Sequence, residues 1–176
     1  MNDFFRSFPA IRTERVLLKR LTEQNADGLQ EMVSNNAVYR YEPTFLYEKK
    51  YDDVHYTIKH LYDECISDSL ILGIFVDSQF CGLAELYGFR DDIHKVSIGY
   101  RLSERFWGKG IASEALSLIV DYLYSNTDIE IITSSSMIEN TASAKVLRKN
   151  GFELVSHGVP EDWGYEQPVI VDKWIR

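Results

Sequence analysis

Hydrophobic and polar positions follow two periods along the chain, and together they predict a mixture of helices and strands. Apolar residues recur at helical spacing in four segments, which predict helices over residues 22–33, 52–65, 110–125 and 141–150. β-Branched and apolar runs predict strands over residues 13–21, 70–77, 80–88, 95–102, 129–135, 152–155 and 169–175. This order indicates one α/β domain over residues 1–176, with a central mixed β-sheet flanked by helices.

The segments between these elements differ in composition. Residues 77–79 are short and polar, as is typical of a hairpin turn, and residues 158–168 are rich in turn-forming residues. Residues 35–50 are irregular and unusually aromatic, with side chains at Tyr39, Tyr41, Phe45 and Tyr47. Such side chains either fill a core or line a pocket.

Composition and charge narrow the class of protein. Hydrophobic residues make up 45% of the 176 positions, which is enough to bury a real core. Lys and Arg number 19 against 27 Asp and Glu, for a net charge of -8. Nucleic acid and anionic membranes are therefore not expected as partners, because both need a basic surface. An anionic ligand would need a local positive site.

Neither the cysteines nor the histidines form a pattern that builds disulfides or binds metal. The two cysteines, Cys65 and Cys81, lack metal-ligand spacing, and we expect both to be buried as small apolar residues. The four histidines are scattered, so no metal is expected. The first residues do not resemble a signal peptide, and no apolar run approaches the roughly 18 residues of a membrane span, which favours the cytoplasm.

The exception to the acidic background is a strand, loop and helix spanning residues 96–125. Gly108 and Gly110 allow the loop backbone to approach a ligand, and free N–H groups at the start of the following helix favour an anion. Three cations, Arg101, Arg105 and Lys109, cluster in the sequence here. We expect a site for an anion, most simply a pyrophosphate.

Two common phosphate-binding motifs do not match this loop. The chain has no G-x-x-x-x-G-K-[ST] sequence, so the loop is not a Walker A motif. It also lacks the third glycine of G-x-G-x-x-G, because Ser113 stands there, and three strands with short turns precede it. An ordinary glycine-containing helix start remains the alternative.

Several motifs resemble the GNAT superfamily of acetyl-CoA-dependent N-acetyltransferases. The run Arg105-x-x-Gly108-x-Gly110-x-Ala112 resembles the (Q/R)-x-x-G-x-(G/A) signature of that family. Residues 13–20 (TERVLLKR) resemble the opening strand of the ribosomal-protein N-terminal acetyltransferase branch. Residues 140–152, with Asn140, Ser143 and a Gly-Phe pair, resemble the N-x-x-S…GF segment. These landmarks fall in family order.

The resemblance implies a GNAT fold and acetyl-CoA as co-substrate, with no metal. Strand 95–102 would splay from strand 129–135, leaving a V-shaped slot for the pantetheine arm. The arm would contact the backbone of Tyr100, Arg101 and Leu102, with Asn140 on the opposite side. The pyrophosphate would be held by Arg105, Phe106, Trp107, Gly108, Lys109, Gly110, Ile111 and Ala112.

The resemblance also implies direct attack of an amine on the acetyl thioester. The amine must lose a proton, so a base should help, and an N–H of Leu102 or a neighbour would stabilise the oxyanion. Glu85 is the first candidate base, because alternation places it on the same, otherwise apolar face as Cys81, Leu83 and Tyr87. The alternatives are a structural ion pair, a charge that protects an edge strand, or a ligand for a cationic substrate.

Ser143 is the candidate for assisting departure of the thiolate. The alternative is that a serine near a helix start bonds only backbone. Many GNAT enzymes use a tyrosine four residues further on as general acid, but this chain has Leu147 there. That departure favours the ribosomal-protein branch, which shares the serine.

The acceptor pocket is expected to involve Tyr39, Tyr41, Glu42, Glu85 and Trp163, with core filling as the alternative for the aromatic residues. The predicted function is transfer of an acetyl group to a primary amine, either a protein or peptide N-terminus or a small-molecule amine. The alternatives are a polyamine or aminoglycoside-type acetyltransferase and a non-catalytic acyl-CoA-binding domain. A monomer and a homodimer are both compatible with the sequence.

Overall fold

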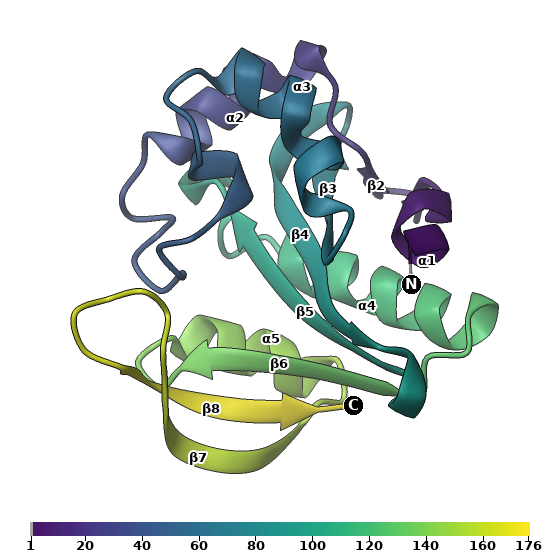
Figure 1. Ribbon diagram of the computed structural model, residues 1–176, viewed down its shortest axis with the longest axis vertical. Coiled ribbons are helices and arrows are strands. Elements are labelled where there is room, and N and C mark those ends of the chain that lie inside the picture. Colours follow the sequence, from purple (N-terminus) through teal and green to yellow (C-terminus); the bar gives the residue numbers. More distant parts are fainter. Residues whose placement is uncertain (1) are drawn as a thin grey trace.

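The computed structural model describes residues 2–176, and its centre is an eight-stranded sheet with helices on both faces (Figure 1). The strand order is β1-β2-β3-β4-β5-β6-β8-β7. Neighbouring strands are antiparallel except β5 and β6, which are parallel. The predicted α/β class with a mixed sheet is confirmed.

The bounds of most elements between α2 and α5 follow the sequence pattern, whereas those at the two ends of the chain differ. The strands are β1 Ile11–Arg12, β2 Val16–Lys19, β3 Ser69–Val76, β4 Gln79–Arg90, β5 Lys95–Leu102, β6 Ile131–Met137, β7 Glu153–Glu161 and β8 Val169–Ile175. The α-helices are α1 Asn2–Ser7, α2 Ala26–Val33, α3 Val54–Cys65, α4 Ile111–Asn126 and α5 Thr141–Lys149. Short 3-10 turns are η1 Glu23–Asn25, η2 Tyr47–Lys49, η3 Asp91–Ile93 and η4 Glu104–Phe106.

The N-terminal segment differs from the prediction of a single strand over residues 13–21. Thr13 makes a turn instead, because its hydroxyl accepts from the amides of Arg15 and Val16, and its amide donates to the Val16 carbonyl. Polar side-chain bonds of this kind compete with the strand ladder. The pattern also failed to predict α1, whose Phe5 is fully buried.

The C-terminal hairpin is longer than predicted. Residues 158–168 were expected to be turn-rich, but β7 continues to Glu161. Pro160 is tolerated because β7 is the edge strand, where a missing N–H costs little. Irregular register on both sides of Ser156 bends the strand. The two strands of the hairpin therefore pair as far as Glu161 and Val169, and residues 162–168 form its turn.

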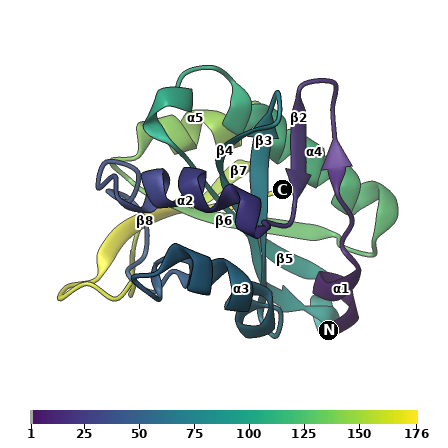
Figure 2. The same cartoon turned by 90° about the horizontal axis from the view of Figure 1, so that it is seen from above.

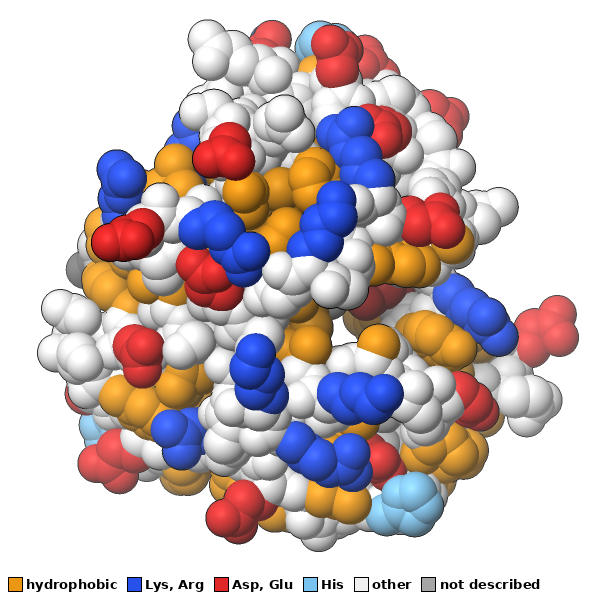
Figure 3. Space-filling view, turned by 180° about the vertical axis from the view of Figure 1, so that it is seen from behind, with side chains coloured by type: hydrophobic (Ala, Val, Ile, Leu, Met, Phe, Trp, Pro, Cys, Tyr) orange, Lys and Arg blue, Asp and Glu red, His pale blue; other side chains and the backbone are white. Residues whose placement is uncertain are grey.

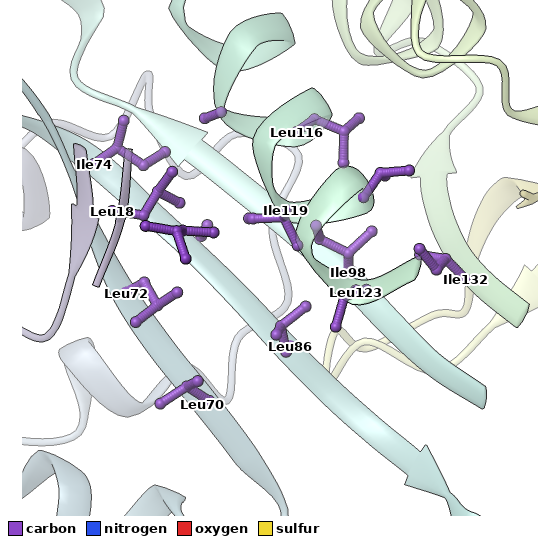
Figure 4. Packing of buried hydrophobic residues seen from close by; sticks show 14 of the residues in the cluster. Leu18, Leu70, Leu72, Ile74, Leu86, Ile98, Leu116, Ile119, Leu123 and Ile132 are labelled. Carbon is purple, nitrogen blue, oxygen red and sulfur yellow. The ribbon is translucent and has the colours of Figure 1, made fainter. Parts of the chain in front are cut away.

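Two apolar clusters lie on opposite faces of the sheet. One packs α4 against β3, β4 and β5, with Leu72, Leu86, Ile98 and Ile119 among its members (Figure 4). The other packs α2 and α3 on the remaining face, around Leu29 and Leu61, as Figure 2 shows from above. Both cysteines are free and buried, as predicted.

The predicted face of Cys81 is wrong. Cys81 belongs to the cluster under α4, whereas Leu83 belongs to the cluster under α2 and α3. A register shift opposite this point, where Phe75 pairs with Phe80 but Ile74 pairs with Gly82, leaves Cys81 as the extra residue. A bulge of this kind reverses the alternation on one side of it.

Among the described residues, no helix has both the length and the apolarity needed to cross a membrane.

Candidate active site

Strands β5 and β6 separate partway along their length. They pair only where Lys95, Val96 and Ser97 face residues 131–133. The Ser134 hydroxyl donates to the Ile98 carbonyl at 2.9 Å where this pairing ends. Beyond that point β5 stays beside β4, and Figure 1 shows β6 running away from it. The predicted splay of these two strands is confirmed.

Backbone groups of β5 face the resulting slot. The Ser103 amide donates to the Cys81 carbonyl of β4 at 2.9 Å. Because successive residues of a strand present their amides to opposite edges, those of Tyr100 and Leu102 face the slot. The Leu102 carbonyl is already used, since the Trp107 indole N–H donates to it at 2.7 Å. Its amide remains as a donor.

The loop between β5 and α4 presents a row of free backbone amides. Gly108 and Gly110 have φ angles of 71° and 76°, which glycine adopts without strain. Within the described chain, no acceptor is recorded for the amides from Gly108 to Ser113, which include the first N–H groups of α4. Such amides, aided by the helix dipole, bind phosphate oxygens. The loop therefore fits the pyrophosphate of a CoA ester.

Cationic side chains surround this loop. Arg105 is half-exposed and pairs with Glu31 at 3.3 Å. Arg15 pairs with Glu114 at 2.6 Å and donates to the Lys109 carbonyl at 3.3 Å, so it braces the loop. Figure 3 shows Lys and Arg side chains on both sides of a hollow between the two halves of the molecule. Glu31 and Glu114 pair with these two arginines, so the backbone amides are the main feature of the loop that favours an anion.

The prediction that Arg101 joins this cationic cluster is wrong. Its side chain is only 2% exposed, and its Nε lies 2.5 Å from Glu48 Oε1. Its Nη1 lies 3.4 Å from Glu85 Oε2 and 3.7 Å from Glu42 Oε2. The reason is the alternation of side chains along β5, which places Arg101 on the face opposite to Tyr100 and Leu102. The backbone of Arg101 faces β4, where Arg101 pairs with Leu83.

Burial controls the protonation of this carboxylate cluster. It raises the pKa of Glu42 to about 8, with Arg101 opposing the shift and the neighbouring carboxylates adding to it. Burial also raises the pKa of Glu85, against the lowering effect of Arg101. One guanidinium thus faces three carboxyl groups. Glu42 and Glu85, the two that line the cavity, therefore stay protonated to a higher pH than an ordinary carboxyl group does.

Asn140 and Ser143 lie across the slot at the start of α5. The Asn140 side-chain carbonyl accepts from the Ser143 amide at 3.1 Å, so it caps the helix. The Ser143 hydroxyl lies 3.0 Å from the Tyr100 hydroxyl of β5. The side chains of Tyr100 and Ser143, one from each wall, are therefore in contact across the slot. Leu147, one turn further along α5, is fully buried.

A cavity of about 540 Å³ extends from the slot toward the carboxylates. Its slot end is lined by Tyr100, Asn140 and Ser143, and its far end by Tyr41, Glu42, Glu85 and Trp163. The structure therefore brings both predicted catalytic residues and most predicted acceptor residues to one space.

Tyr39 is the exception among the predicted acceptor residues. It lies in the core cluster under α2 and α3, and its hydroxyl donates to Glu48 Oε1 at 3.3 Å. Burial raises its pKa, so the hydroxyl stays protonated and acts as a donor. The core-filling alternative holds for this residue.

The C-terminal hairpin closes one wall of the cavity. Both the amide and the hydroxyl of Thr44 donate to the Trp163 carbonyl, at 2.9 and 3.1 Å. The Tyr165 hydroxyl donates to the Glu42 carbonyl at 2.7 Å. Gly164 has a φ of 82°, and a Cβ there would collide with the Thr44 hydroxyl. The hairpin and residues 42–44 therefore form one wall from distant parts of the chain.

Three residues of this region carried no usable signal in the sequence. Glu48 is buried and holds Arg101, yet it sits in an irregular segment without periodicity. Glu161 lines the cavity at the end of β7 and pairs with Lys173 at 2.8 Å. Tyr100 was expected to contribute only its backbone, but its side chain also lines the cavity. Among the described residues, no group of three or more potential ligands is placed to hold a metal ion.

Comparison with known proteins gives consistent matches. Residues 15–153 match the family described as the acetyltransferase (GNAT) domain. Over 162 residues the chain is 26% identical to the uncharacterized N-acetyltransferase YoaA of Bacillus subtilis, covering 90% of each chain.

Solved structures share the fold. The structure of RimL, a ribosomal L7/L12 alpha-N-protein acetyltransferase, in complex with coenzyme A superposes with a TM-score of 0.80 at 20% identity, over 95% of this chain and 97% of that one. Spermidine N-acetyltransferase from Vibrio cholerae, in complex with CoA and spermine, gives a TM-score of 0.75 at 17% identity, over 93% and 96% of the two chains.

Proposed function

Because the chain belongs to the GNAT acetyltransferase family and is thus an N-acetyltransferase, we propose that it transfers the acetyl group of acetyl-CoA directly to a primary amine. The observation that supports this proposal most is the cavity that joins the slot between β5 and β6 to the Glu42 and Glu85 carboxyls. An acyl thioester and an amine would enter it from opposite ends. The acceptor is a protein or peptide N-terminus or a small-molecule amine.

The groups that line the slot have separate roles in this proposal. The amides from Gly108 to Ser113 bind the pyrophosphate, and the Tyr100 and Leu102 amides bind the pantetheine arm. The Leu102 amide is also the candidate donor to the oxyanion. Ser143 lies beside the position of the thioester sulfur. Acetyl-CoA supplies the activated acetyl group, and no covalent enzyme intermediate is needed.

A cationic small-molecule amine is the second candidate acceptor. The cavity is lined by five carboxyl groups, those of Glu42, Asp68, Glu85, Glu161 and Asp162, against the single guanidinium of Arg101. This excess of carboxyl groups favours an acceptor that carries a second positive group. The ribosomal-type alternative requires a peptide to reach the same space with its N-terminus.

A thiol-release assay with a panel of amines tests the proposed function. The panel includes short peptides with free N-termini, linear diamines and polyamines, and aminoglycosides, each at pH 8 with acetyl-CoA. We expect turnover with at least one class. Binding of acetyl-CoA by calorimetry without turnover on any amine would instead support a non-catalytic acyl-CoA-binding domain.

The pH dependence of kcat/KM tests the proposed base. Arg101 approaches Glu85 at 3.4 Å and Glu42 at 3.7 Å, and its positive charge opposes the rise in the pKa of each carboxyl group. The base must be ionised, and burial raises the pKa of Glu85, so kcat/KM should rise with pH over a range above that of an ordinary carboxyl group and then level off. Glu85→Gln should remove this rise and lower kcat/KM by roughly 100-fold.

Glu42→Gln is the matched control for that experiment. Burial and the charge of Glu48, not Glu42, raise the pKa of Glu85, so the rise should remain near its wild-type position. A rise that stays in place in both variants would come from the amine itself. An unchanged profile in Glu85→Gln would contradict its role as the base and favour the structural ion pair.

A further inference from the structure

The Tyr100 and Ser143 hydroxyls form a contact across the slot that the sequence did not predict. Their oxygens lie 3.0 Å apart, and the Ser143 carbonyl is a second, more distant acceptor for the Tyr100 hydroxyl at 3.3 Å. Tyr100 comes from β5 and Ser143 from the start of α5, 43 residues later. Both side chains line the same cavity. Their separation and placement make this pair part of the site.

We propose that Tyr100 is a positioning residue, which donates its hydroxyl hydrogen to Ser143 Oγ and thereby directs the hydrogen of Ser143 to the departing sulfur. This inference rests on the proposed acetyl transfer. A serine hydroxyl has one hydrogen and two lone pairs. If Tyr100 supplies the donor of the pair, the serine oxygen accepts and its own hydrogen is free for the thioester.

Three features of the structure support this direction of donation. Burial raises the pKa of Tyr100, so its hydroxyl stays protonated throughout the working pH range. The Asn140 cap fixes the Ser143 backbone, which limits the positions that its hydroxyl reaches. Leu147 places an apolar side chain one turn further on, and it is fully buried. Leu147 therefore offers the sulfur no hydroxyl, which leaves Ser143 as the donor on α5 and Tyr100 of β5 as the group that orients it.

The chemistry of the step balances without a further reactant. The amine nitrogen bonds to the acetyl carbon, and the carbon–sulfur bond breaks with its electron pair going to sulfur. The Ser143 hydrogen bond stabilises the negative charge on that sulfur. The proton lost by nitrogen passes to the base and reaches the thiolate through solvent. Ser143 and Tyr100 both keep their protons.

A double-mutant cycle with Tyr100→Phe and Ser143→Ala tests the proposal. Each single variant should lower kcat by roughly tenfold, as expected for the loss of one hydrogen bond to a developing charge. Because Tyr100 acts through Ser143, the double variant should lose no more than Ser143→Ala alone. The affinity for CoA, measured by calorimetry, should stay within twofold in all three variants.

Control measurements separate this role from a structural one. Tyr124→Phe makes the same change on an exposed part of α4 and should leave kcat unchanged. A merely structural role for Tyr100 would lower CoA affinity or the melting temperature together with kcat. Losses that multiply in the double variant, or a kcat within twofold of wild type in Tyr100→Phe, would overturn the proposal. Absence of turnover in the wild-type protein would instead overturn the proposed function.

Discussion

Replacing Arg101 by Gln is expected to lower the free energy of unfolding by about 3–5 kcal/mol at pH 7. The change removes the positive charge that contacts Glu48 at 2.5 Å and also faces Glu42 and Glu85. Three buried or nearly buried carboxyl groups then lose their common partner. Urea denaturation of Arg101→Gln and the wild-type protein at pH 7 measures the difference.

The size of this loss should depend on pH in a defined direction. Without the guanidinium, the pKa values of Glu42 and Glu85 rise further in the folded protein, while those of the unfolded chain stay near 4.5. Between these values the folded state holds more protons, so its stability falls as pH rises. The destabilisation should therefore be larger at pH 8 than at pH 5.5.

Arg105→Gln provides a matched control. Arg105 pairs with Glu31 at the surface, where both side chains are about half exposed. An exposed ion pair contributes about 0–1 kcal/mol, so this variant should unfold almost as the wild type does. Equal losses in the two variants, or a loss in Arg101→Gln that does not grow with pH, would show that the buried cluster does not depend on Arg101.

The features that the sequence predicted correctly depend on local signals. The bounds of β5 and β8 match the predicted strands, because alternating and β-branched residues define each strand within its own segment. The loop from Arg105 to Ala112 is recognisable because two glycines precede a helix start. In each case the information lies within about ten residues, so no knowledge of distant contacts is needed.

The features that the sequence missed depend on contacts between distant segments. Arg101 is close to other cations in the sequence, but its side chain follows the alternation of β5 and meets Glu48, 53 residues earlier. The Tyr100 and Ser143 contact arises because β5 and β6 separate, which brings α5 to the slot. Cys81 lies on the other face because of one bulge. Periodicity assigns Arg101 to a face of β5, but it carries no signal for its partner Glu48, for the Tyr100–Ser143 contact or for the bulge. The single domain over residues 1–176 and the cytoplasmic location stay predictions.

Replacing Gly108 by Asp is expected to abolish measurable binding of acetyl-CoA. The φ of Gly108 is 71°, and a Cβ there would meet no atom within 4 Å, so the loop has room for a side chain. The new carboxylate would stand beside the amides that are proposed to bind the pyrophosphate. A like charge about 5 Å away costs about 3 kcal/mol at an effective dielectric constant near 20, which is roughly a hundredfold in affinity.

Gly108→Asn separates charge from backbone conformation. Asn has almost the same shape as Asp and tolerates a positive φ better than most residues, yet it carries no charge. We expect Asn to weaken binding only a few-fold in calorimetry, while Asp removes it, with both variants melting within a few degrees of each other. Equal losses in Asp and Asn would assign the effect to backbone strain. Unchanged affinity in Gly108→Asp would contradict the assignment of this loop to the pyrophosphate, and the slot between β5 and β6 would then need a different ligand.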